Sequence, residues 1–379
     1  MKLILVEPGG HHLSGHMREK ILLAAVSLRE LGVGVTLVGW AETPPPDVVL
    51  DDYVCPPSFV RHVAGWIPRK LTTLYIEFWV YLTAFIASRS GKMGVIGMTS
   101  SGPYGPVFAS FFCHPPAAYL QRMIHPGLFP VSGGWGIVRR RALAWKCLVR
   151  NGGRLVCFNE LMQTTFDQSV GPGATVCIPE FIALPGPEKI TERKIRRLLA
   201  TGWDNARRSP VGHLERLEDF AGLNEIIIHD PELNAEKLQP LRDRLATCPS
   251  VKLTGISGYF TGGAWLELFA RADASLIAYA GTFPAMSALF LQSIACGLPV
   301  VSSRFPDGIE CFARFGKLGE LFDYGDRGTL SAAIARICAW SDLDWKEFFS
   351  AREGLLAAVN PASSLSQYLS FLKKQHACP

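Results

Sequence analysis

Residues 274–303, ASLIAYAGTFPAMSALFLQSIACGLPVVSS, decide the fold. The apolar run SLIAY predicts a short buried strand, and GTFPAM, with Gly281 and Pro284, predicts a loop. SALFLQSIACG places apolar residues at helical spacing and closes on Gly297, after which LPVVSS begins a second strand. The pattern indicates a strand–helix–strand unit of a parallel sheet. An ordinary crossover that binds nothing is the plainest alternative.

The start of the expected helix is the part of this unit that points to a function. Ser287 or a neighbour is placed to cap the helix, since a hydroxyl oxygen accepts a hydrogen bond from a free backbone N–H. The remaining N–H groups and the positive end of the helix dipole then face the crevice above the strands. We expect an anion such as a diphosphate to bind there.

The stretch resembles the donor-site signature of retaining GT-B glycosyltransferases of the family-4 type, whose helix reads roughly Leu-x-x-Ala-x-Ala-x-Gly-x-Pro-Val-Val. The adjoining residues 304–326, RFPDGIECFARFGKLGELFDYGD, resemble the segment on the C-terminal side of that helix in the family. The resemblance implies an α/β fold of two Rossmann-like domains facing a cleft, with a C-terminal helix that packs back on the first domain. It also implies transfer of a sugar from a nucleotide-diphosphate sugar, with retention at the anomeric carbon.

The chain departs from the signature at its paired glutamates. Many members carry two glutamates eight positions apart, and here those positions hold Pro284 and Gln292. The amide of Gln292 can still hydrogen-bond a ribose hydroxyl, whereas Pro284 cannot replace a carboxylate. This leaves two hypotheses: an enzyme that uses a loop with Ser287, or a catalytically degenerate protein that binds or regulates. A sugar-nucleotide epimerase would need acid and base residues that we do not find.

The resemblance also implies which residues form the site. The expected donor-binding residues are Gly9, Gly10, Gly202, Arg207, Arg208, Gly255, Ile256, Met286, Ser287 and Gln292. The expected catalytic residues are His12, His125 and Arg208. Charge builds on the departing diphosphate, and an arginine can clamp phosphate through two hydrogen bonds. With these arginines to neutralise that charge, the resemblance implies metal-independent transfer with no cofactor.

The first glycine-rich turn rules out one common class of nucleotide-binding enzyme. Gly9, Gly10 and Gly15 do not fit the G-x-G-x-x-G fingerprint, so an NAD-dependent dehydrogenase is not expected.

A length of 379 residues suggests two domains. We predict an acceptor-binding domain over residues 1–185, a nucleotide-sugar-binding domain over 186–360, and a returning helix over 361–379.

The amino-acid composition indicates the class of protein and the cell compartment in which it is expected. Hydrophobic residues make up 48% of the chain and charged residues 19%, which is typical of a folded globular protein. The ten cysteines are scattered without a C-x-x-C pair, so we expect them to be reduced thiols in a cytosolic protein. The apolar start MKLILVEPGG is too short for a signal sequence and predicts a first strand.

Charge is distributed unevenly along the chain. Residues 1–158 carry 16 Lys and Arg against 8 Asp and Glu, and the remainder carries 22 against 25. Between Cys55 and Phe158 the only acidic residue is Glu77, against twelve basic ones. A basic surface of this kind suits an anionic membrane or a lipid-phosphate acceptor. A plain solvated surface is the alternative, and nucleic acid is not expected because no recognition motif accompanies the charge.

The apolar run from Leu71 to Ala87 has three interpretations. Its seventeen residues reach the lower limit for a membrane span, but Glu77 favours a core helix. A helix lying in the membrane interface, with flanking tryptophans and basic residues at headgroup depth, is the third. We therefore expect a cytoplasmic protein, either free or attached peripherally to the inner face of the cell membrane, with a glycan or lipid-linked acceptor.

Overall fold

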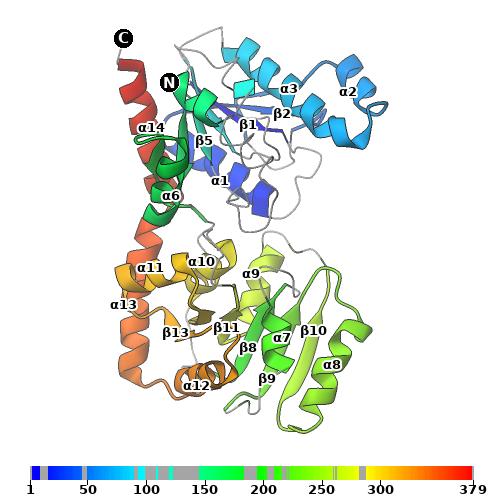
Figure 1. Cartoon of the computed structure of the whole chain (residues 1–379), viewed down its shortest axis with the longest axis vertical. Helices are drawn as coiled ribbons and strands as arrows, with labels where there is room; N and C mark the ends of the chain where they lie inside the picture. The colour runs from blue at the N-terminus through cyan, green and yellow to red at the C-terminus, as the bar shows by residue number, and fades with distance from the viewer. Residues whose placement is uncertain are drawn as a thin grey trace. The chain divides into compact units, whose positions relative to one another are not determined.

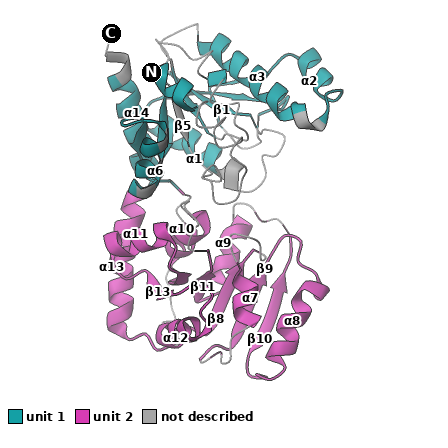
Figure 2. Ribbon diagram, in the orientation of Figure 1, with its two compact units in different colours: residues 1–181, 359–379 teal, residues 182–358 magenta. Residues whose placement is uncertain are grey.

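The computed structural model describes most of the chain. The described residues are 2–8, 16–44, 49–88, 93–98, 108–109, 119–122, 145–182, 194–202, 209–215, 220, 222–258, 260, 263–280 and 287–377. The chain divides into two compact units (Figures 1 and 2). Unit 1 comprises Met1–Phe181 with Val359–Pro379, and unit 2 comprises Ile182–Ala358. The first break lies four residues before the expected boundary at 185.

Unit 1 contains a parallel sheet of seven strands in the order β3-β2-β1-β4-β5-β6-β7. The strands are β1 Lys2–Glu7, β2 Gly34–Gly39, β3 Asp52–Val54, β4 Met93–Gly97, β5 Tyr119–Arg122, β6 Arg154–Cys157 and β7 Thr175–Cys177. The helices are α1 His16–Glu30, α2 Ser58–Ala64, α3 Arg69–Ser88, α6 Glu160–Val170 and α14 Pro361–Ala377. The described part of a helix ending at Arg150 precedes β6.

Unit 2 contains a parallel sheet of six strands in the order β10-β9-β8-β11-β12-β13. The strands are β8 Arg197–Thr201, β9 Glu225–His229, β10 Lys252–Ile256, β11 Ala274–Ile277, β12 Val300–Ser303 and β13 Gly319–Phe322. The helices are α7 Pro210–Glu215, α8 Ala235–Leu245, α9 Gly263–Ala270, α10 Ala288–Ala295, α11 Pro306–Phe315, α12 Arg327–Cys338 and α13 Asp342–Ala358.

The unit 2 sheet has the doubly wound order 3-2-1-4-5-6, and the unit 1 sheet has the same order with a seventh strand added, which confirms the expected pair of Rossmann-like domains. The central strands of unit 2 are buried at successive residues, because helices cover both faces of such a sheet. That is why β11 (ASLI) and β12 (VVSS) show no alternation of buried and exposed residues, and their serines are buried as well.

The C-terminal helix returns to the first unit, as expected from the resemblance. α14 packs against α1 and β5. A Cβ on Gly94 of β4 would lie 2.9 Å from a methyl carbon of Leu372 on α14 and 2.8 Å from one of Leu3 on β1. The absence of a side chain at Gly94 therefore lets the helix approach the sheet closely.

The helix α3 contains the long apolar run of the sequence. Leu71–Ser88 within it is long and apolar enough to cross a membrane by length and composition alone. The helix nevertheless packs against β1, β2, β3 and β4. Glu77 is completely buried within this packing. These contacts are those of a core helix, and Trp79 is only partly exposed because it packs edge-on against Tyr75 and Phe78.

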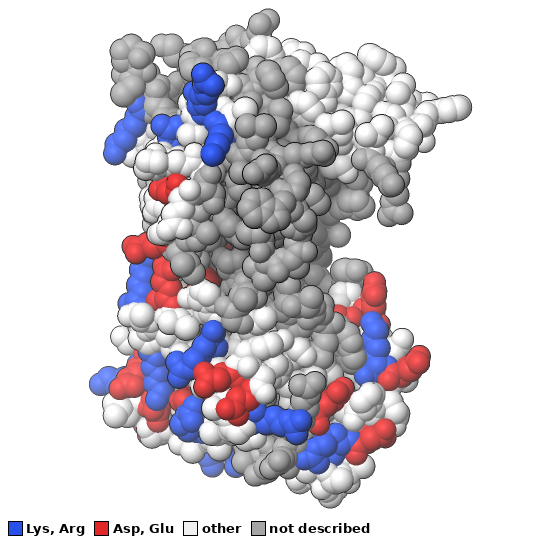
Figure 3. Space-filling view, in the orientation of Figure 1, with Lys and Arg blue, Asp and Glu red and all other residues white. Residues whose placement is uncertain are grey.

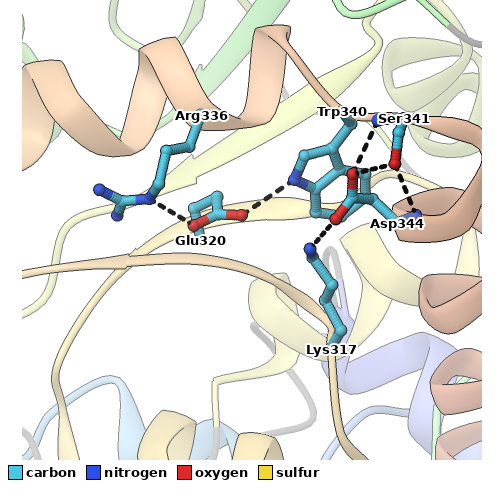
Figure 4. Close-up of polar contacts among 6 residues, drawn as sticks. All are labelled: Lys317, Glu320, Arg336, Trp340, Ser341 and Asp344. Atoms are coloured by element: carbon cyan, nitrogen blue, oxygen red, sulfur yellow. Dashed lines mark hydrogen bonds and ion pairs between the residues drawn. The ribbon is translucent and has the colours of Figure 1, made fainter.

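The edge strand β13 is tied to the helices that come after it in the chain (Figure 4). Oε2 of Glu320 accepts a hydrogen bond from Nε of Arg336 at 2.8 Å, and Oε1 accepts one from Nε1 of Trp340 at 2.9 Å. One carboxylate thus joins β13 to the end of α12 and to the turn after it.

A second carboxylate in the same view fixes the start of α13 (Figure 4). Asp344 pairs with Lys317 and accepts hydrogen bonds from the backbone N–H and hydroxyl of Ser341, at 2.7 and 2.6 Å. The Lys317 ammonium and then Ser341 hold the pKa of Asp344 well below its usual range. Ser341 and Asp344 form a capping arrangement that begins the helix.

Candidate functional site

The candidate site lies where the central strands of unit 2 end. Thr201 of β8 is in register with His229 of β9, and His229 is in register with Ile256 of β10. The neighbouring strands β8 and β11 form the switch point of the sheet, where the strand order reverses. In open α/β sheets, ligands bind outside the carboxyl ends of the strands at this point.

The helix α10 begins beside the switch point, and Ser287 is its N-cap, as the sequence predicted. Oγ of Ser287 accepts a hydrogen bond from the backbone N–H of Phe290 at 3.0 Å and donates one to the hydroxyl of Tyr279 at 3.0 Å. The backbone of Tyr279 is held in turn by the side chain of Ser303, at 2.9 and 2.7 Å. The cap is therefore anchored to the ends of β11 and β12, and the helix N-terminus is fixed relative to the sheet.

The far end of α10 is held by α13. The guanidinium of Arg352 donates hydrogen bonds to the carbonyl oxygens of Ile294, at 3.0 Å, and Ala295, at 2.5 Å from Nη2. These carbonyls belong to the negative end of the helix dipole, where a cation is stabilising. Arg352 thus acts as a positioning residue, since it fixes the helix whose other end faces the candidate site.

Gln292 lies within α10 and is only 5% exposed. An amide with two donors and an acceptor can hydrogen-bond a ribose hydroxyl, and this contact stays a prediction.

Gly202 makes the turn at the end of β8. Its φ of 84° lies in the left-handed region that glycine adopts at no steric cost. Its N–H donates to the carbonyl of His229 at 2.6 Å, which ties the turn to the neighbouring strand. The turn leads into residues 203–208, which lie outside the described residues.

Gly255 and Ile256 have structural roles that the sequence did not indicate. A Cβ on Gly255 would lie 2.5 Å from a methyl carbon of Leu238, so the packing of α8 accounts for the glycine. The carbonyl of Ile256 accepts a hydrogen bond from the N–H of Asp230 at 3.2 Å. Contact between this backbone and a nucleotide base stays a prediction.

His229 and Thr201 were missed as site residues. Nε2 of His229 contacts the carbonyl of Gly258 at 3.1 Å, and the ring stacks on Phe260 with centroids 5.1 Å apart. Nδ1 of His229 and Oγ1 of Thr201 are buried on adjacent strands, and neither has a hydrogen-bond partner among the residues that the structure describes. Buried polar atoms of this kind call for a water or a ligand group. The sequence held one indication of this site, because the apolar run at 226–228 is followed directly by His229, Asp230 and Pro231.

The burial of His229 gives a pH-dependent prediction. Desolvation lowers the pKa of the imidazole in the folded protein. In the unfolded chain the ring takes up a proton near pH 6.5, so below that pH the unfolded state binds more protons and the free energy of unfolding falls. We expect the wild type to lose more stability than His229→Asn between about pH 7.5 and 5.5 in urea titrations. His62→Asn, at an exposed position of α2, is the control, and equal losses in wild type and His229→Asn would contradict the prediction.

Several predicted site residues fall outside the described residues, and their roles stay predictions. These are Gly9, Gly10, His12, His125, Arg207, Arg208 and Met286. Among the residues that are described, no group of three or more His, Cys, Asp or Glu is arranged to hold a metal ion.

Comparison with known proteins identifies the fold. No protein-family model matches the chain, and no curated protein matches it in sequence. Sucrose-phosphate synthase from Thermosynechococcus elongatus matches in structure with a TM-score of 0.68 at 16% identity, covering 100% of this chain and 99% of that one. A glycosyltransferase from Rickettsia africae matches with a TM-score of 0.71 at 12% identity, covering 100% and 99%. The chain has the GT-B glycosyltransferase fold.

A third GT-B structure is similar over the same extent. HepE from Anabaena, solved in complex with UDP, matches with a TM-score of 0.65 at 13% identity and covers 98% of this chain and 99% of that one. The identities are low, so these likenesses establish the fold, and the activity has to be argued from the site.

Proposed function

We propose that this protein is a glycosyltransferase that transfers a sugar from a nucleotide-diphosphate sugar to an acceptor. The observation that carries the proposal is the arrangement at the carboxyl edge of the unit 2 sheet. At this edge lie the capped N-terminus of α10, within which Gln292 is buried, and the ends of β8 and β9, where Oγ1 of Thr201 and Nδ1 of His229 have no hydrogen-bond partner among the described residues. The likeness to Anabaena HepE, which was solved with UDP and with UDP-glucose, supports the choice of donor class.

In the proposed mechanism, the protein stabilises the charge that develops on the departing diphosphate. The N–H groups at the start of α10 supply fixed dipoles, and Ser287 holds them in place. Arg207 and Arg208 supply the positive charge without a metal ion or cofactor. His12 and His125 position the sugar and the acceptor. Retention at the anomeric carbon is proposed from the family resemblance.

We propose a glycan or a lipid-linked precursor as the acceptor. TarM, solved with fondaparinux, α-GlcNAc-glycerol and UDP, and WaaG, a glycosyltransferase involved in lipopolysaccharide biosynthesis, support this class because both match along most of the chain. The excess of basic over acidic residues between Cys55 and Phe158 also suits an acceptor that carries lipid phosphate. The proposed location is the cytoplasm, with attachment to the inner face of the cell membrane.

A donor screen tests the activity. Release of nucleoside diphosphate from UDP-, GDP-, ADP- and dTDP-sugars would be followed on the purified protein, with a bacterial lipid extract as the acceptor source. We expect one donor to react in an extract-dependent way. Gln292→Ala should raise the KM for that donor about 5- to 10-fold, the equivalent of one hydrogen bond of about 1 kcal/mol. Arg208→Ala should lower kcat by about 100-fold or more, as loss of a charge-stabilising group does.

The matched control is Gln239→Ala. Gln239 is exposed on α8 and donates a hydrogen bond to Asp243, so its loss should leave KM unchanged. Stabilisation by one nucleotide without any turnover would favour the catalytically degenerate alternative, which Pro284 and Gln292 raise. Absence of both turnover and nucleotide binding would overturn the proposal.

A further inference from the structure

His213 of the helix α7 makes a hydrogen bond with each of its two ring nitrogens. The side chain is 8% exposed and packs against the rings of Phe322 and Tyr324, whose centroids lie 5.7 and 4.6 Å from its own. Nδ1 lies 2.5 Å from the carbonyl oxygen of Ser209, and Nε2 lies 3.0 Å from the backbone nitrogen of Gly325. His213 therefore links the start of α7 to the turn between β13 and α12, although His213 and Gly325 are 112 residues apart in the chain.

The partners of the ring determine which nitrogen carries the proton. A backbone N–H can only donate, so Nε2 of His213 accepts the hydrogen bond from Gly325. The proton of the neutral ring therefore lies on Nδ1, which donates to the carbonyl of Ser209. The same carbonyl accepts a hydrogen bond from the backbone N–H of His213 at 3.2 Å. The imidazole thus holds the carbonyl of Ser209 with a directed donor, and it does so only as this tautomer.

Ser209 connects the two groups that the proposed mechanism uses to bind the diphosphate. In the sequence it directly follows Arg207 and Arg208, which lie outside the described residues. The N–H of Ser209 donates to the carbonyl of Ala278 at 3.1 Å, just after the end of β11. The next residue, Tyr279, contacts the cap of α10 through its hydroxyl. A continuous series of contacts therefore runs from the turn after β13, through the imidazole, to the residue that follows the arginines and on to the start of α10.

The charge of unit 2 explains why the placement of these groups matters. On the face in view, Lys and Arg side chains are interspersed with Asp and Glu side chains among the described residues of unit 2 (Figure 3). The sequence after Phe158 carries 22 basic residues against 25 acidic ones. A mixed surface of this kind attracts an anion only weakly, so a diphosphate has to be bound by a few groups at fixed positions.

We propose that His213 is a positioning residue for the donor diphosphate. Its Nδ1–H fixes the carbonyl of Ser209, and Ser209 in turn fixes the spacing between the preceding arginines and the N-terminus of α10. The imidazole touches neither the donor nor the acceptor in this role. The inference rests on the proposed function, since it assigns to His213 the support of the same diphosphate site. It makes donor binding depend on one hydrogen bond from a side chain that is buried.

Two substitutions separate positioning from simple stabilisation. His213→Phe keeps a ring against Phe322 and Tyr324 but loses both hydrogen bonds, so we expect the Kd for the nucleoside diphosphate to rise about tenfold. In His213→Asn the amide nitrogen can take the place of Nδ1 and donate to Ser209, so we expect a Kd within about twofold of the wild type. This variant should nevertheless melt at a lower temperature than His213→Phe, because it gives up the ring packing. The probe is whichever of UDP, GDP, ADP and dTDP the full-length wild type binds most tightly, measured by calorimetry.

Thr329→Val is the matched control. The hydroxyl of Thr329 accepts a hydrogen bond from the N–H of Asp323 at 3.0 Å, so this variant loosens the same turn while the hydrogen bonds of His213 remain. It should lower the melting temperature and leave the Kd unchanged. If the Kd followed the melting temperature across all variants, or if His213→Phe bound the nucleotide as the wild type does, His213 would have only a structural role.

A third variant keeps the test decisive if His213→Phe does not fold. The longer side chain of His213→Gln places its amide at the position of Nε2, where it can accept from Gly325 but no longer holds Ser209. We expect it to bind the nucleotide about tenfold more weakly than His213→Asn, and equal affinities would contradict the proposal. A wild type that binds none of the four nucleotides would overturn the proposed function and this inference with it. A wild type that binds one of them, with variants of equal Kd, would overturn this inference alone.

Discussion

Replacing Lys20 by methionine is expected to lower the free energy of unfolding by about 3–5 kcal/mol. Nζ of Lys20 on α1 lies 2.6 Å from Oε2 of Glu180, and both side chains are less than a tenth exposed. Glu180 also accepts a hydrogen bond from the N–H of Phe181 at 3.0 Å. Removal of the cation leaves a buried carboxylate that lacks its ionic partner, and desolvation of such a charge is costly.

A second variant separates the loss of the ion pair from a loss of packing. Lys20→Met combined with Glu180→Gln keeps the volume and the hydrogen bond to Phe181 but removes the buried negative charge, so we expect recovery of most of the stability. Lys252→Met is the control. Lys252 pairs with Glu225 at 3.2 Å and is 72% exposed, so its loss should cost only about 0–1 kcal/mol. The measurement is urea unfolding of all variants, and equal losses for Lys20→Met and Lys252→Met would contradict the prediction.

The ion pair between Lys20 and Glu180 could not be predicted from the sequence. Lys20 and Glu180 are 160 residues apart, and nothing in the local pattern around either residue points to the other. Their contact exists only after the seven strands of unit 1 have been ordered. The same holds for Thr201 and His229, which become neighbours through the register of β8 and β9.

Local features were predicted correctly where their causes are local. The strand–helix–strand unit at 274–303 and its cap at Ser287 arise from hydrophobic spacing and from the chemistry of a hydroxyl beside free N–H groups. The pair of Rossmann-like domains was inferred from the resemblance and is confirmed. The run at 71–87 was ambiguous because hydropathy alone does not separate a core helix from an interfacial one. The buried position of Glu77 shows that this run forms a core helix.

The need for glycine at position 319 could not be predicted from the sequence either, because it arises from the close approach of two strands. A Cβ at Gly319 would lie 1.9 Å from the carbonyl oxygen of Val300 and 2.6 Å from its nitrogen. Gly319 and Val300 are partners in the pairing of β13 with β12. The overlap is with backbone atoms, so no side-chain rotation can relieve it, and the two strands would have to separate. From the sequence alone, Gly319 is one of several glycines in the segment that resembles the donor-site signature.

We therefore expect Gly319→Ala to destabilise unit 2 by at least about 4 kcal/mol and to yield little folded protein. The effect should extend to the candidate site, since Ser303 at the other end of β12 holds Tyr279, which in turn contacts the cap of α10. Gly354→Ala is the matched control. Gly354 lies within α13, where a Cβ would meet Phe315 at an ordinary 3.5 Å, so alanine should be neutral or stabilising by about 0.5–1 kcal/mol. Soluble yield and melting temperature measure both variants. A Gly319→Ala protein that melts within a few degrees of the wild type would mean that β12 and β13 can separate without loss of the fold, and that the candidate site does not depend on their pairing.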